Sequence, residues 1–156
     1  LMALESFPSR TTKPLAALSF DFGTQSIGVA FGQSISGTAR PVCVLKANDG
    51  IPDWEQVGSV IAEWSPDVLV IGLPYNLDGT ESELLKRAIK FGNRLNGRFH
   101  KPCYGMDERL SSRAAIEQVM EESGSMTKTS VIDDIAAQII LENWFSEFKR
   151  QVENIR

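Results

Sequence analysis

Three acidic side chains occupy positions where a carboxylate could do chemistry. Asp21 lies inside a strand-like apolar run, Glu108 closes another such run, and Asp133 lies in the first turn of a helical pattern. An aspartate is a poor strand former, and burying one without a partner is costly. Asp21 therefore calls for a metal, another cation or a strong hydrogen-bond network.

Three carboxylates from separate elements repel one another unless a cation lies between them. Hard oxygen ligands favour Mg²⁺ or Mn²⁺ over zinc. The single histidine, His100, and the separated Cys43 and Cys103 exclude a histidine-rich zinc centre. Two such ions can activate a water, hold a phosphate and stabilise the leaving oxygen, which is what phosphodiester cleavage requires.

Each acid also has a structural interpretation. Asp21 could end its strand and accept hydrogen bonds from the turn amides of residues 24–26. Asp107 or Glu108 could pair with Arg109, or lead into a helix capped by one of the serines that follow. Asp133 could be a first-turn acid favoured by the helix dipole and by a capping serine three residues before it.

The final helical pattern distinguishes two neighbouring aspartates. At 100° per residue, Asp133 falls on the line of Ala137, Ile140 and Trp144, near the middle of the apolar face. Asp134 falls at the polar edge of that face. A capping role explains an acid in the first turn but not its position on the buried face, so we favour Asp133 as the functional group.

A second set of side chains could bind phosphate. Lys86, Lys90 and Arg94 recur every four residues and form one stripe on a helix, which could contact a nucleic-acid backbone. Together with Arg109 they are the candidate substrate-binding residues, although a solvated helix face is the alternative. The segment Gly72–Thr80 suits an anion or substrate loop, but it lacks the Gly-Lys-Ser/Thr ending of a P-loop.

These residues are positioned by alternating strand and helix patterns. Strands are predicted at Leu15–Thr24, Ile27–Gly32, Pro41–Lys46, Val68–Leu73 and Cys103–Glu108, and helices at Asp53–Trp64, Glu81–Leu95, Ser112–Glu122 and Ser130–Phe148. This order predicts an α/β domain with a mixed five-stranded sheet flanked by helices. We assign residues 15–150 to that domain and residues 1–14 to an N-terminal extension.

Composition limits the class of protein. The 156 residues are 42% hydrophobic and 23% charged, values typical of a globular domain. No apolar run approaches the roughly 20 residues needed to span a bilayer, and the first dozen residues lack the apolar stretch of a signal peptide. We expect a cytoplasmic protein with buried thiols. The net charge of −4 argues against a surface that attracts nucleic acid everywhere, but it allows a local basic stripe.

Five segments carry a family resemblance. They are DFGTQSIGVA at Asp21–Ala30, TARP at Thr38–Pro41, GLPYNLDGT at Gly72–Thr80, DERLSS at Asp107–Ser112 and IDDIAAQIIL at Ile132–Leu141. In this order they resemble the YqgF/RuvX family, nucleases of ribosomal RNA precursors that are related to Holliday-junction resolvases. The resemblance extends from about Leu15 to Phe148.

The resemblance implies an RNase H-like fold with Asp21, Glu108 and Asp133 as the acidic site. It also implies maturation of the 5′ end of small-subunit ribosomal RNA in the bacterial cytoplasm, by a monomer or homodimer, with branched DNA as another possible substrate. Asp134 stands where relatives often carry a small residue, so the last motif offers two candidate ligands.

Two other classes of protein remain as alternatives. DFGTQS also looks like the phosphate loop of sugar kinases and actin-like ATPases, but those proteins need two such domains around a nucleotide. A non-catalytic nucleic-acid or protein binding module is the other alternative, in which the three acids would be structural.

Overall fold

The computed structural model describes residues 4–8, 13–76, 78–108 and 129–155, without the side chains of 129–133, 154 and 155. Its elements are β1 (Ala16–Asp21), β2 (Ser26–Gln33), β3 (Thr38–Asn48), β4 (Ile51–Pro52), α1 (Trp54–Trp64), β5 (Val68–Leu73), α2 (Glu83–Phe99), β6 (Cys103–Asp107) and α4 (Thr129–Ile155). The helix predicted at Ser112–Glu122 lies outside the described residues.

The described strands form one mixed sheet of six in the order β4-β3-β2-β1-β5-β6. Neighbours from β1 to β4 are antiparallel, whereas β5 is parallel to both β1 and β6. The predicted mixed sheet is confirmed, but the predicted count of five strands is wrong because Ile51–Pro52 adds β4 at the edge. Two residues are too few to give a periodic pattern, and a proline inside a sheet is confined to positions such as an edge.

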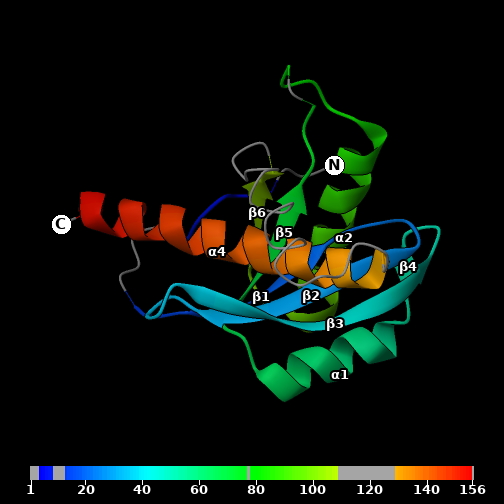
Figure 1. Cartoon of the computed structure of the whole chain (residues 1–156), viewed down its shortest axis with the longest axis horizontal. Helices are drawn as coiled ribbons and strands as arrows, with labels where there is room; N and C mark the ends of the chain where they lie inside the picture. The colour runs from blue at the N-terminus through cyan, green and yellow to red at the C-terminus, as the bar shows by residue number, and fades with distance from the viewer. Residues whose placement is uncertain (1–3, 9–12, 77, 109–128, 156) are drawn as a thin grey trace.

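Helices cover both faces of the sheet (Figure 1). On one face, Leu18 and Phe20 of β1 and Phe22 just after it belong to a core shared with α1 and α2. On the other face, Ala17 belongs to a core shared with α4, which includes Trp144. The alternation expected of β1 is therefore confirmed, and it places Asp21 on the α4 face.

The helix boundaries have local causes. Asp53 caps α1 by accepting a hydrogen bond from the Glu55 amide at 2.9 Å, and Ser82 caps α2 by accepting one from the Leu85 amide at 3.0 Å. Both helices end at a left-handed residue, Ser65 or His100. All six residues of β5 are buried, as expected for a central strand covered on both faces.

Residues 4–8 of the N-terminal segment pack against the domain. The Glu5 carbonyl accepts a hydrogen bond from the Gly105 amide at 2.8 Å, and the Ser6 carbonyl accepts one from Trp144 Nε1 at 2.8 Å. Phe7 stacks on the Trp144 ring at 5.7 Å between centroids. Among the described helices, none is long and apolar enough to cross a membrane.

Candidate active site

Three parallel strands bring their carboxyl ends to one edge of the sheet. β5 lies between β1 and β6, with Ile71 opposite Phe20 of β1 and Gly72 opposite Met106 of β6. Asp21 ends β1, and Glu108 directly follows β6. Alternation places Asp21, Gly72 and Glu108 on the α4 face, at the edge where open α/β sheets usually form their sites.

Gly72 is the residue that allows the two acids to meet across β5. A Cβ atom at this position would lie 3.0 Å from Glu108 Oε1 and 2.6 Å from Ile140 Cδ1 of α4. Any larger residue would require the Glu108 carboxylate and the Ile140 side chain to shift. The space beside Gly72 is therefore filled by Glu108, whose side chain extends toward Asp21.

The electrostatics of Glu108 reflect this enclosed position. Burial raises the pKa of Glu108, a hydrogen bond with the Asp21 side chain acts in the lowering direction, and the Asp107 carboxylate raises it further. Two carboxyl groups at hydrogen-bond distance share a proton or require a cation, because two negative charges at that distance repel. Their oxygen atoms are the hard donors that suit Mg²⁺ or Mn²⁺.

The last described helix crosses β1 close to this pair. Ser19 Oγ donates a buried hydrogen bond of 2.6 Å to the Ala137 carbonyl, while Ala17 packs in the cluster that holds Leu141 and Trp144. α4 therefore runs antiparallel to β1, and its first turns lie toward the Asp21 end (Figure 1). Asp133 belongs to α4 one turn before Ala137, but its side chain lies outside the described residues.

Asp134 affects the electrostatics of a side chain on β3. Burial raises the pKa of the Cys43 thiol on β3, and the Asp134 charge raises it further. Asp134 itself is partly buried. Within the described residues, no three acidic, histidine or cysteine side chains gather as a metal-binding group. The structure thus brings Asp21 and Glu108 together.

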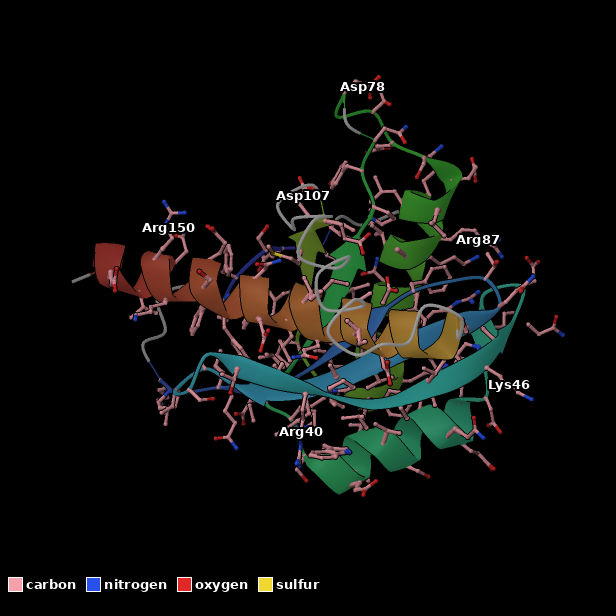
Figure 2. The ribbon with its side chains drawn as sticks, in the orientation of Figure 1. Arg40, Lys46, Asp78, Arg87, Asp107 and Arg150 are labelled. Atoms are coloured by element: carbon pink, nitrogen blue, oxygen red, sulfur yellow. The ribbon has the colours of Figure 1, made fainter. Side chains whose placement is uncertain are left out.

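The predicted basic stripe lies on the surface of α2. Lys86, Lys90 and Arg94 are all exposed, and Lys86 forms an ion pair of 3.6 Å with Glu83. Lys90 and Arg94 line a pocket together with Arg87, which the stripe did not include. Figure 2 labels Arg87 on α2 and Asp107 at the end of β6. Arg109 lies outside the described residues.

The loop after β5 is held by its own hydrogen bonds. The Asn76 amide donates to the Thr80 carbonyl at 3.2 Å, and the Gly79 amide donates to the Asn76 carbonyl at 2.9 Å. The Thr80 amide donates to Asp78 Oδ1 at 2.9 Å. These three amides are used inside the loop, so they are not available for the anion contact that the sequence suggests.

Comparison with known proteins identifies the family. A family model described as RuvX: Holliday junction resolvase matches residues 15–147. The chain belongs to the RuvX family. RuvX is a nuclease family, and this member is a nuclease, as its sequence predicts.

Bacterial relatives of this RuvX chain carry the name pre-16S rRNA nuclease. A Glaesserella parasuis protein is 54% identical over 131 residues, covering 83% of this chain and 95% of the relative. An Aeromonas hydrophila protein is 52% identical over 132 residues, covering 83% and 94%. A Pseudomonas aeruginosa protein is 49% identical over 137 residues, covering 86% and 95%.

Solved structures share the fold of this RuvX chain. Thermus thermophilus RuvC aligns with a TM-score of 0.51 at 13% identity, over 86% of this chain and 96% of that chain. The yeast mitochondrial Holliday junction resolvase Ydc2 aligns with a TM-score of 0.51 at 10% identity, over 88% and 80%. These likenesses confirm the predicted RNase H-like fold.

Sequence reasoning assigned no structural role to two residues of this RuvX chain. Gly72 looks like the start of a loop motif, although its position in the apolar run VLVIGL signals a close approach within a strand. Arg87 sits one position from the stripe of Lys86, Lys90 and Arg94. Its partner, Asp49, is 38 residues away, so helical periodicity carries no signal for the pair.

Proposed function

We propose that this RuvX chain uses Mg²⁺ or Mn²⁺ to cleave the small-subunit ribosomal RNA precursor near its mature 5′ end, in the bacterial cytoplasm. The observation that carries the proposal is the hydrogen-bonded pair Asp21 and Glu108 at the carboxyl edge of parallel strands. The names of the bacterial relatives support the choice of substrate. The description of the family model supports a junction-cleaving role, but the relatives at 49% to 54% identity are named for the RNA precursor, and the solved resolvase structures share only the fold.

We assign the metal ligands to Asp21, Glu108 and Asp133. The first two meet the requirement for hard oxygen donors, and Asp133 lies on the helix that crosses β1 at Ser19. A bound divalent ion supplies charge stabilisation to the phosphate and lowers the pKa of a coordinated water. Metal binding requires the charged form of Glu108, which burial disfavours and a bound cation would favour.

We assign substrate binding to basic side chains on α2 and to Arg109. Lys86, Lys90 and Arg94 on α2 contact backbone phosphates, and Arg109 contacts the substrate beside Glu108. Asp21 is held by its place at the end of β1, opposite Gly28 of β2. Glu108, which directly follows β6, is held in the space beside Gly72.

A cleavage assay tests the proposal. Purified protein is incubated with ribosomal RNA precursor, a four-way DNA junction and linear controls, each with and without Mn²⁺. We expect metal-dependent cleavage of the RNA precursor near its mature 5′ end and a loss of cleavage in Asp21→Asn. Cleavage of the junction alone would reassign the substrate, and equal cleavage by Asp21→Asn would refute the site.

A further inference from the structure

A basic pocket lies between α2 and the turn that joins β3 to β4. Arg87, Lys90 and Arg94 contribute its cationic side chains, and Asp49 contributes the one carboxylate. Phe22, which follows Asp21 in the chain, contributes an aromatic ring to the same pocket. The pocket is therefore positively charged overall and lies on the α2 face, opposite the face that carries the acidic pair.

The wall of this pocket is built by a long-range contact. Arg87 Nη2 donates a hydrogen bond of 3.0 Å to Asp49 Oδ1 and another to the Asp49 carbonyl. Asp49 and Gly50 both have positive φ, at 50° and 83°, as a tight turn requires. A Cβ at Gly50 would lie 3.2 Å from Arg87 Nη2 and 3.0 Å from the Phe22 ring, so the turn is closely packed against both residues.

Lys90 and Arg94 differ from the other cations around the pocket. Arg87 is paired with Asp49, and Lys86 outside the pocket is paired with Glu83. Neither Lys90 nor Arg94 forms an ion pair with any residue that the structure describes. These two side chains lie one helical turn apart on the same pocket, and their charged groups suit the anionic oxygens of one phosphate.

The pocket is connected to the active site through residues 22–26. The Thr24 carbonyl accepts a hydrogen bond of 2.8 Å from the Gly50 amide, and the Gln25 carbonyl accepts one of 2.9 Å from the Ala47 amide. Residues that directly follow Asp21 are thus fixed to the turn that lines the pocket. The end of β1 that carries Asp21 and the turn that lines the pocket therefore lie at the same edge of the sheet.

We propose that the pocket binds a backbone phosphate of the nucleic-acid strand that is cut, through Lys90 and Arg94 together. The proposal rests on the proposed nuclease function and narrows the assignment of Lys90 and Arg94 to one shared phosphate, on the face of the sheet opposite the acidic pair. Arg87 is a positioning residue, because it holds the turn through Asp49.

Binding of a fluorescent single-stranded RNA that spans the precursor's 5′ boundary tests this subsite. Measurements are made in EDTA, so that no cleavage occurs, for wild type, Lys90→Gln, Arg94→Gln and the double variant. We expect each single variant to weaken binding about tenfold, as for loss of a charge-assisted hydrogen bond. The double variant should lose much less than the product of the two single losses, because both residues hold the same phosphate.

The salt dependence gives a second readout. One shared phosphate predicts that the slope of log K against log salt falls by about 0.7 in the double variant, as for one contact to a single strand. A fall of twice that size, with additive losses, would mean two independent contacts and would overturn the shared subsite. Arg98→Gln is the matched control, because Arg98 lies on the same helix outside the pocket, over the Trp54 ring.

Other outcomes separate the pocket from the nuclease site. Equal weakening by Arg98→Gln and Lys90→Gln would indicate diffuse attraction along α2 and overturn the proposal. Thermal stabilisation by inorganic phosphate that the double variant lacks, with unchanged RNA binding, would assign the pocket to a free anion instead. Wild-type protein that binds the RNA through the pocket but cleaves no substrate in Mn²⁺ would refute the nuclease site alone.

Discussion

The two sides of one sheet edge carry opposite charges for different physical reasons. Asp21 and Phe22 are neighbours in the chain, yet Asp21 faces α4 and Phe22 faces α2. On the α4 side, Glu108 is enclosed beside Gly72 and its pKa is raised by burial. On the α2 side, Lys90 and Arg94 are exposed. Enclosed carboxylates call for a bound cation, whereas exposed cations contribute mainly to the binding of a charged strand.

The largest effect is expected from removing a metal ligand on the acidic side. Asp133→Asn keeps the shape of the side chain but removes its charge, so cleavage should fall on the order of 10³-fold. Asp134→Asn should have a much smaller effect, since helical periodicity places Asp134 at the polar edge of the face of α4 that packs on the sheet. Single-turnover cleavage with Mn²⁺ measures both variants. A dead Asp134→Asn beside a fully active Asp133→Asn would reverse the assignment.

Each side of the sheet edge has a glycine whose substitution tests that side separately. Gly72→Ala places a Cβ against Glu108 and Ile140, so the cleavage rate at saturating RNA should fall more than affinity. Gly50→Ala places a Cβ against Arg87 and Phe22, at a backbone position with positive φ. The affinity for RNA should therefore fall more than the cleavage rate. Overpacking of this kind typically destabilises the fold by about 1–3 kcal/mol.

Gly97→Ala is the control for both glycine variants. Gly97 lies on the exposed side of α2, and a Cβ there would meet no atom within 4 Å. We expect this variant to be more stable than wild type by up to about 1 kcal/mol, because alanine favours a helix. Rate and affinity losses that are the same in Gly72→Ala and Gly50→Ala would mean that the two sides do not act separately.

The smallest effect is a pH-dependent change in the stability of the metal-free protein. Folding raises the pKa of Glu108 above its ordinary value of 4.5, so the folded state binds this proton more tightly than the unfolded state. Ionisation of Glu108 therefore destabilises the folded state. This effect is absent below pH 4.5 and grows as the pH rises through the raised pKa of Glu108 in the folded protein. Glu108→Gln removes it, so the variant should become more stable relative to wild type as pH rises.

Thermal melts of wild type and Glu108→Gln in EDTA, from below pH 4.5 upward, measure the difference in stability between the two proteins. Added Mg²⁺ should stabilise wild type more than the variant, because a ligand that binds only the folded state stabilises it. A stability difference that does not change with pH would show that Glu108 titrates normally and is not enclosed.

Local sequence patterns determined much of the fold. Alternation in β1 placed Asp21 on the face opposite Phe20, and the apolar run of β5 identified a strand buried on both faces. The helical line through Ala137, Ile140 and Trp144 identified the buried face of α4. These predictions succeeded because the chemistry of each element repeats with its own period, so a short segment contains its own signal.

The family resemblance grouped Asp21 with Glu108, but only the tertiary structure decided how residues far apart in the chain meet. β5 lies between the strands that lead to Asp21 and Glu108, and Glu108 reaches Asp21 because Gly72 of β5 leaves space for its side chain. This arrangement depends on strand order and register. One wall of the pocket depends on the contact of Arg87 with Asp49, which are far apart in the chain. The edge strand β4 has only two residues, so it shows no periodic pattern in the sequence. Contacts between residues far apart in the chain depend on how elements pack, and periodicity within an element contains no information about that packing.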